Sequence, residues 1–258
     1  MTRRDRILRE MGLAPIYVRR DPPDEPMRDM ARERSMSPAA RPSEPAATPD
    51  DSSAAAEDSR RRMIAAMGWD ELSEAVANCR ACRLCEQRKQ AVLGVGDRKP
   101  QWLFVGEGPG AEEDARGEPF VGQAGKLLDA MLAAIGLRRG EGVYIANAVK
   151  CRPPGNRTPE ASETAACLPY LERQIDLLAP RIIVALGRPA AQTLLNTEIK
   201  IAAARGRDFV YRGVPLVVTY HPAYLLRNLP DKARAWEDLL FARQQLARVR
   251  DPKNIPMT

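Results

Sequence analysis

Residues 147–167, with the sequence NAVKCRPPGNRTPEASETAAC, decide the fold. They follow the apolar run 143–146, whose β-branched and aromatic side chains predict a buried strand. Two prolines and a glycine at 153–155 exclude helix and central strand, because proline lacks a backbone donor and glycine loosens the chain. A helix is predicted to resume afterwards, with Pro159 suited to its first turn and Cys167 inside it. The stretch is therefore a polar loop at the carboxyl end of a strand, where ligands bind in open α/β sheets.

Outward from this loop, apolar runs alternate with amphipathic patterns. Strands are predicted at 101–106, 143–147, 181–186 and 214–220, with a shorter one at 208–211, and helices at 123–135, 159–178 and 232–248. This alternation predicts an α/β protein with three layers, α/β/α, in which helices cover both faces of a central, mainly parallel four-stranded sheet.

Polar residues follow three of the predicted strands. Glu107 comes after the first, Asn147 after the second and His221, the only histidine in the chain, after the last. Because the carboxyl ends of parallel strands meet at one edge of a sheet, these residues are expected to lie together. Such a convergence of polar side chains predicts an active site.

Five cysteines occur at positions 79, 82, 85, 151 and 167. A disulfide framework is not expected in a chain of this size without a signal peptide. The spacing C-x2-C-x2-C in the first group indicates a metal or an iron–sulfur cluster, and thiolates suit zinc as well as iron.

The composition divides the chain into three parts. Residues 1–66 hold eight of the 22 prolines, with runs of Ala and Ser and mixed charges, and this composition predicts disorder. Residues 67–250 form the predicted domain, and 251–258 a short tail. The N-terminus lacks the apolar core of a signal peptide, and no run approaches the roughly 18 apolar residues of a membrane helix. We therefore expect a soluble, cytoplasmic protein that does not enter a membrane.

The charge of the predicted domain is basic. Residues 1–66 carry 13 Lys and Arg against 12 Asp and Glu, so five of the six net positive charges belong to the remainder. A basic globular part is compatible with a polyanion such as nucleic acid as partner.

Six motifs in order resemble the family 4 uracil-DNA glycosylases, the iron–sulfur type of bacteria and archaea. They are C-x2-C at 79–82, GEGPG at 106–110, PFVG at 119–122, NAVKCRPPGNR at 147–157, Cys167, and HPAY at 221–224. The resemblance covers about residues 67–248. It implies a parallel sheet between helices and an enzyme of base excision repair. Such an enzyme flips uracil out of DNA and hydrolyses its N-glycosidic bond, which leaves an abasic site.

The resemblance also implies roles for the residues after the strands. Phe120 stacks on the flipped base, Asn147 contacts its O4 and N3 edge, and His221 lies near O2, where negative charge gathers. Gly108 and Glu113, with Glu107, line the sugar and C5 side of the pocket, where Glu113 is placed to exclude the methyl group of thymine.

One position departs from the better-known uracil glycosylases, which carry a water-activating aspartate just before the proline of the first motif. Gly108 stands there in this chain, so Glu107, one residue earlier, and Asn156 are the candidates to position water. A dissociative route with late capture of water follows as an expectation.

Contacts with DNA are expected from the same loops. The residues suited to contact phosphate or to fill the gap left by the flipped base are Lys150, Arg152, Arg157, Leu225 and Arg227, with Leu226 between the last two.

For the cysteines, the resemblance implies a structural [4Fe–4S] cluster held by Cys79, Cys82, Cys151 and Cys167. Cys85 is then an additional thiol, although the spacing also allows it to replace Cys79. Zinc is the alternative metal.

Two other functions compete with excision. Some relatives in this superfamily bind uracil-containing DNA without turnover or trap the sugar through a histidine in a basic loop, but no histidine lies between Lys150 and Cys167. A nucleotide-binding module would use the glycines at 106–110, yet the Lys-Ser/Thr ending of a phosphate loop is absent. A monomer is expected, and the N-terminal extension is a potential binding segment for a repair or replication partner.

Overall fold

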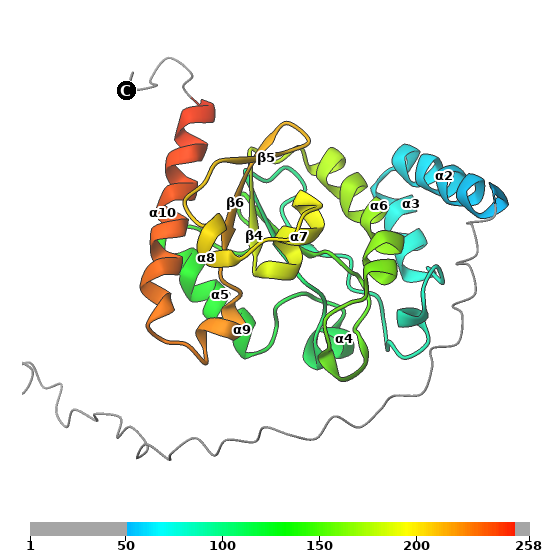
Figure 1. Cartoon of the computed structure of the whole chain (residues 1–258), viewed down its shortest axis with the longest axis horizontal. Coiled ribbons are helices and arrows are strands. Elements are labelled where there is room, and N and C mark those ends of the chain that lie inside the picture. Colours follow the sequence, from blue (N-terminus) through cyan, green and yellow to red (C-terminus); the bar gives the residue numbers. More distant parts are fainter. Residues whose placement is uncertain (1–50, 251–258) are drawn as a thin grey trace, which may run out of the picture. The chain divides into compact units, whose positions relative to one another are not determined.

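The computed structural model describes residues 51–250, with side chains from 55 to 249, and its centre is a sheet with the strand order β1-β3-β2-β4-β6-β5 (Figure 1). The four inner strands run parallel: β2 (Trp102–Gly106), β3 (Val143–Asn147), β4 (Ile182–Leu186) and β6 (Val214–Thr219). The outer strands β1 (Val95–Gly96) and β5 (Phe209–Tyr211) pair antiparallel to β3 and β6.

The predicted number of four strands is therefore wrong, because within residues 51–250 the sheet has six. Strand β5 is joined to β6 by a tight turn in which Arg212 and Gly213 both have positive φ angles, of 50° and 81°. A turn of this kind brings the following strand back antiparallel, as in a hairpin. The prediction of a mainly parallel three-layer fold is confirmed, and the additional strands protect its edges.

Helices connect the strands and cover both faces of the sheet. The helices are α2 (Asp51–Ala66), α3 (Trp69–Ala77), α4 (Ala111–Arg116), α5 (Gln123–Ala134), α6 (Ala161–Leu178), α7 (Arg188–Leu195), α8 (Ile201–Ala204), α9 (Pro222–Leu225) and α10 (Asp231–Arg250). Two short 3-10 helices, η1 (Arg83–Cys85) and η2 (Pro154–Asn156), lie in the cysteine segment and in the loop after β3. In this described part of the chain, no helix combines the length and apolar character that a membrane span needs.

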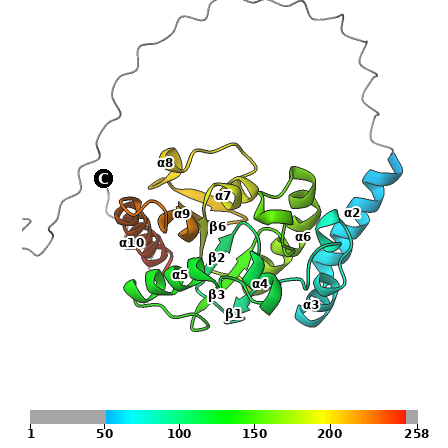
Figure 2. The ribbon, with the colours of Figure 1, turned by 90° about the horizontal axis from the view of Figure 1, so that it is seen from below.

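The core has one apolar cluster on each face of the sheet. Along β2, Trp102 and Phe104 pack with α5 and α10, whereas Leu103 and Val105 pack with α6 and α7. Figure 2 shows α5 and α10 on one side of the strands and α6 and α7 on the other. All five residues of β2 are buried, which is the pattern of a strand covered on both faces.

Residues 51–66 form helix α2, so the predicted disorder is wrong for this segment. Ile64 of α2 is buried in a third apolar cluster with Leu72 and Val76 of α3, and Arg61 pairs with Glu172 of α6 at 2.9 Å. A helix with one strongly apolar position is stabilised mainly by such packing, which the periodicity of the segment does not reveal. Residues 1–50 and the predicted tail 251–258 lie outside the described residues, so their predicted disorder and partner contacts stay predictions.

Asp238 of α10 makes a buried ion pair with Arg205, at the end of α8, and a hydrogen bond with the end of β6. Arg205 donates its Nε hydrogen to both carboxylate oxygens of Asp238, at 2.9 and 2.8 Å, and Thr219 Oγ1 donates to Asp238 Oδ2 at 2.7 Å. Asp238 and Thr219 are both buried. Since Thr219 lies two residues before His221, this contact also holds the strand end from which His221 projects.

Asp238→Ala tests this contact. We expect the free energy of unfolding to fall by about 3 kcal/mol, because the change leaves the largely buried Arg205 guanidinium without its main partner. Glu237→Ala is the matched control, since Glu237 pairs with the same guanidinium at 3.1 Å but is mostly exposed; we expect a change of less than about 1 kcal/mol. Urea unfolding of both variants measures the difference, and equal effects would contradict the role of Asp238.

Candidate active site

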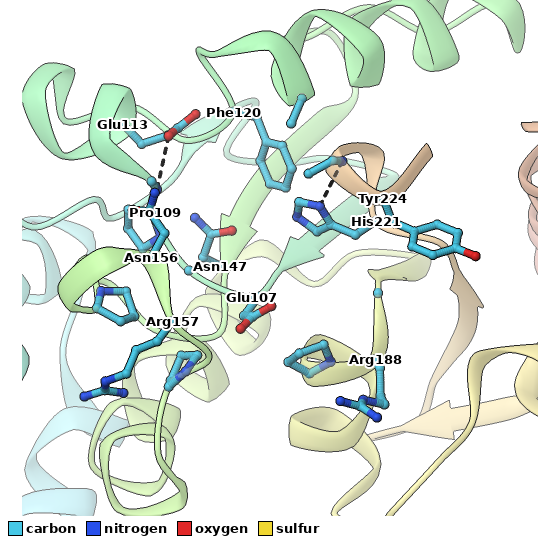
Figure 3. Close-up of a pocket in the computed structure, with 18 of the residues that line it drawn as sticks. Glu107, Pro109, Glu113, Phe120, Asn147, Asn156, Arg157, Arg188, His221 and Tyr224 are labelled. Atoms are coloured by element: carbon cyan, nitrogen blue, oxygen red, sulfur yellow. Dashed lines mark hydrogen bonds between the residues drawn. The ribbon is translucent and has the colours of Figure 1, made fainter. Parts of the chain in front are cut away.

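A pocket of about 750 Å³ opens at the carboxyl ends of the parallel strands (Figure 3). Loops after all four inner strands contribute to its wall. Nine of the predicted site residues line it: Glu107, Gly108, Glu113, Phe120, Asn147, Asn156, Arg157, His221 and Arg227. Of the predicted DNA contacts, Lys150, Arg152 and Leu225 do not line it, and the predicted metal ligands lie at another site.

Asn147 is the last residue of β3 and lies opposite Gly106 in the parallel pairing of β2 with β3. Its side chain is 2% exposed and lines the pocket. Its Oδ1 atom is the buried side-chain polar atom that has no hydrogen-bond partner among the described residues. A buried acceptor without a partner costs about 1–3 kcal/mol, so an atom of this kind in a pocket wall indicates a place where a ligand donates.

Gly106 lets the Asn147 amide approach the ring of Phe120. A Cβ atom at Gly106 would lie 2.4 Å from Asn147 Oδ1 and 2.6 Å from Phe120 Cζ, which is closer than real atoms approach. The glycine at the end of β2 is therefore a spatial requirement of the pocket rather than a turn signal.

Phe120 is buried, with 6% of its surface exposed. Its ring joins the core cluster beneath α5, while one side faces the pocket, 5.5 Å from the ring of His221. The backbone of Phe120 has a positive φ of 55°, and Arg139 holds it by donating to the carbonyls of Pro119 and Phe120, both at 2.8 Å. The ring is thus fixed from behind, as a stacking surface requires.

Glu113 connects the two loops on this side of the pocket. Its Oε2 accepts from the backbone N–H of Gly110 at 3.1 Å, and its Oε1 accepts from those of Val121 and Gly122 at 3.0 and 3.2 Å. Three backbone donors hold the carboxylate in one orientation. Glu113 therefore positions the loop that carries Phe120, beyond the predicted role in excluding a methyl group.

Gly108 packs against Val149, and a Cβ atom there would lie 2.7 Å from Val149 Cγ2. The backbone leaves no room for an aspartate at this position unless Val149 moves. The carboxylate on this side of the pocket is that of Glu107, which points toward the pocket centre in Figure 3. Burial raises the pKa of Glu107, and a hydrogen bond with Thr158 and the charge of Arg188 counteract this rise.

Arg188 was missed in the sequence. It is the first residue of α7, two positions after the end of β4, and it is an exposed residue of the pocket wall. The signal that could have identified it is its place after the strand predicted at 181–186, at the same sheet edge as Glu107, Asn147 and His221.

His221 caps helix α9, and its Nδ1 atom accepts a hydrogen bond from the backbone N–H of Ala223 at 3.1 Å. Since Nδ1 uses its lone pair, the proton of the neutral ring is on Nε2. Burial and the charge of Arg227 lower the pKa of His221 to about 4, with Glu113 acting in the opposite direction. The ring is therefore a neutral donor at physiological pH.

Two of the predicted DNA contacts are wrong, because the side chains are inside the protein. Lys150 and Leu225 are each 1% exposed. The neighbour of Leu225, Leu226, is 41% exposed. Of the arginines, Arg227 is exposed, whereas Arg157 makes a bidentate pair with Glu163 at 2.7 and 2.8 Å. Arg152 lies outside the pocket, and its Nε donates to Asn156 Oδ1 at 2.7 Å.

The five cysteines line a second, small cavity between α3, η1 and α6. Cys151 and Cys167 are buried, and the three cysteines of the first group are partly buried. N–H groups point at the sulfurs: Arg88 Nη1 lies 2.8 Å from the Sγ of Cys151, and the backbone N of Lys150 lies 3.2 Å from that of Cys167. Both cysteine groups therefore lie at the same cavity.

The donor chemistry of this cavity fits a thiolate-bound metal group. Within residues 51–250, no three Cys, His, Asp or Glu donors converge as closely as a single metal ion requires, and the sulfurs surround the cavity instead. Burial raises the pKa of Cys151 and of Cys167, the latter to about 12. Such thiols become thiolates only when a bound cation replaces their protons.

Comparison with known proteins places this geometry in a family. Residues 93–240 match the model of the uracil DNA glycosylase superfamily. The chain is similar to a type-4 uracil-DNA glycosylase of Pyrobaculum aerophilum, 45% identical over 195 residues, which are 72% of this chain and 99% of that protein. It is also similar to a type-4 uracil-DNA glycosylase of Thermotoga maritima, 47% identical over 63% of this chain and 85% of that protein. A type-5 uracil-DNA glycosylase of Thermus thermophilus is 37% identical over 50% of this chain and 64% of its own length.

The protonation state of His221 can be measured directly, because it is the only histidine. In ¹⁵N-histidine NMR, we expect the neutral Nε2–H form between pH 8 and 5 and protonation near pH 4, against the ordinary 6.5. The unfolded chain binds this proton at a higher pH than the folded chain. The His221 contribution to stability therefore declines as the pH falls from about 6.5 to about 4. Titration near 6.5 in the folded protein would contradict this environment.

Proposed function

The chain belongs to the uracil-DNA glycosylase superfamily and to its type-4 branch, and on this premise we propose that its pocket removes uracil from DNA. The reaction is hydrolysis of the N-glycosidic bond after the uracil nucleotide has left the base stack. Its product is an abasic site, which the later steps of base excision repair consume.

The single observation that carries this proposal is the unpartnered Oδ1 of Asn147 in the pocket wall. Uracil offers a donor at N3 and an acceptor at O4, which match the carbonyl and the NH₂ of a carboxamide. Cytosine reverses both groups, so it would leave the buried amide unpaired. Each unpaired buried group costs about 1–3 kcal/mol, which supports strong rejection of cytosine.

The neighbouring rings suit the remaining parts of the base. The fixed face of Phe120 is proposed to stack on the flipped uracil. The Nε2–H of His221 is proposed to donate to O2, where negative charge develops as the bond to the sugar breaks. A neutral imidazole with a low pKa keeps its own proton, so it stabilises the leaving anion as a hydrogen-bond donor rather than as an acid.

Glu107 is proposed to position the attacking water and to stabilise positive charge on the sugar. Its carboxylate points into the pocket. Burial raises the pKa of Glu107, while Thr158 and Arg188 oppose this rise and so favour the charged form that both roles require. Asn156 remains the second candidate, but its Oδ1 already accepts from Arg152. The side chain of Asn156 therefore has fewer atoms left to contact water.

DNA contacts are proposed for the exposed residues around the pocket. Arg227 and Arg188, both exposed in the pocket wall, are suited to contact phosphates, and the partly exposed Arg152 outside the pocket is a further candidate. Leu226, rather than the buried Leu225, is the apolar side chain that can enter the gap left by the flipped base.

We further propose that the cysteine cavity holds a [4Fe–4S] cluster through Cys79, Cys82, Cys151 and Cys167. In such a cluster each thiolate binds a different iron, which suits sulfurs that surround a cavity, whereas zinc requires four donors about 2.3 Å from one point. When bound, the cluster supplies a structural cross-link between the cysteine segment and the loop after β3. N–H donors to the sulfurs, as from Arg88, are typical of the surroundings of these clusters.

Asn147→Asp tests the base contact. We expect single-turnover excision of uracil to fall by roughly 100-fold, because the change removes the donor to O4 and places an anion there. Excision of mispaired cytosine is expected to rise relative to uracil, since a carboxylate can accept from its amino group. Alkali cleavage of an oligonucleotide with one uracil measures the abasic product and separates turnover from mere binding or covalent trapping.

The matched control is Asn196→Asp, which makes the same chemical change at an exposed position at the end of α7. It is expected to leave excision unchanged. Wild-type uracil excision by Asn147→Asp would assign the base edge to another residue.

Cysteine variants test the metal group. Purified protein is expected to be brown, with absorbance near ~400 nm from iron–thiolate ligation. Cys151→Ala is expected to lose this absorbance and its iron, whereas Cys85→Ala at the same cavity keeps both. Iron and zinc analysis of each variant gives the measurement, and a colourless, active protein with stoichiometric zinc would reject the cluster.

A further inference from the structure

Lys150 is a buried lysine whose ammonium group contacts Asn147, a residue of the pocket wall. Its Nζ donates to the main-chain carbonyl of Asn147 at 2.9 Å and to Oε1 of Gln174 on α6. No carboxylate among residues 51–250 pairs with it. Burying a lysine ammonium group without a carboxylate partner costs free energy. Its presence here therefore indicates that the ammonium group has a specific role at this position.

The partner of Lys150 is itself held in one orientation. Gln174 is 0% exposed, and its Nε2 donates to the carbonyl of Leu93 at 2.9 Å and lies 3.4 Å from the hydroxyl of Tyr144. Because the NH₂ group is committed to these oxygens, the amide oxygen faces Lys150. The position of Nζ is therefore set by α6 and by β3 together, not by the flexible lysine chain alone.

Lys150 also contacts the cysteine cavity. Its backbone N lies 3.2 Å from the Sγ of Cys167, the next residue in the chain is Cys151, and Lys150 is one of the residues that line the cavity. One residue thus touches the thiol site through its main chain and the residue of the base contact through its ammonium group. Asn147 and Cys151, which belong to the two sites, are only four positions apart in the sequence.

We propose that Lys150 is a positioning residue that holds the Asn147 peptide, and with it the Asn147 amide, in the orientation that receives uracil. The carbonyl that it contacts lies at the end of β3, where the backbone leaves the sheet and turns toward the cysteines. Without the ammonium group, this carbonyl loses its donor, and rotation of the peptide moves the side chain that the pocket depends on. Lys150 acts through Asn147 and touches neither base nor phosphate. The expected effect of Lys150 on uracil excision rests on the proposed function. Its expected effect on the position of Asn147 rests on the structure alone.

Lys150→Met tests the proposal, because methionine fills much of the same volume without a donor. Lys99→Met, at an exposed lysine before β2, is the matched control. For Lys150→Met we expect uracil excision under single-turnover conditions to fall at least about 10-fold, and inhibition by free uracil to weaken by a similar factor. Affinity for DNA with a non-cleavable abasic-site analogue, and absorbance of the metal group, are expected to stay within about 3-fold of wild type.

A merely structural lysine would give a different result. Equal losses of uracil inhibition and of abasic-DNA affinity, or wild-type excision by the variant, would overturn the proposal. If Lys150→Met does not fold, Gln174→Met carries the test, since it removes the other acceptor of Nζ and is expected to shift the same two readouts in the same direction. Where both fold, the double variant is expected to lose no more than Lys150→Met, because the two residues act on one carbonyl.

A crystal structure of Lys150→Met gives a readout that does not depend on catalysis. We expect the carbonyl of Asn147 to turn away from the vacated donor position and the Asn147 side chain to change its rotamer. An unchanged Asn147 in this variant would overturn the proposal even if excision fell. An inactive wild-type protein would instead refute the proposed function, while the position of Asn147 in the variant would still decide the role of Lys150.

Discussion

The pocket depends on the parallel pairing of β2 with β3, which sets Gly106 opposite Asn147. In this register the last residue of each strand is at the same sheet edge. The absence of a side chain at Gly106 leaves the space that the Asn147 amide and the Phe120 ring share. A register shift by one residue would turn the amide to the other face of the sheet. The strong burial of both strands is what holds the register, because their apolar residues contact helices on both faces.

Groups outside the pocket or at its edge hold the side chains that face its centre. Arg139 fixes the backbone of Phe120, Glu113 connects the two loops beside it, and Asp238 holds the strand end before His221 through Thr219. Each of these contacts satisfies buried backbone or charged groups, so each is costly to break. Rigid loops of this kind suit a site that must distinguish uracil from cytosine by two hydrogen bonds, since a displacement of the amide would weaken both.

The cysteine segment is the part of the described chain with the least regular structure. Between α3 and β1 it contains only the short helix η1, and it packs through the third apolar cluster against α2 and α6. The proposed cluster would supply the cross-links that strands and long helices supply elsewhere. Its location next to the loop after β3 gives the loop a second support, in addition to the hydrogen bonds of Lys150.

The sequence by itself determined the layered fold, the strand ends and the residues after them. Period-2 and period-3.6 patterns and the Gly-Pro turns are local properties of the chain, so Glu107, Asn147 and His221 could be placed at one sheet edge before any coordinates. Only the tertiary structure decided which side chains at that edge are buried. Lys150 and Leu225 look like surface groups in a basic loop, and α2 looks like an extension. The burial of Lys150 depends on Gln174, that of Leu225 on α5 and α10, and that of Ile64 in α2 on α3 and α6. Most of these partners are distant in sequence. A side chain is buried by neighbours that folding brings together, and the pattern of residues along the chain does not show which neighbours these are.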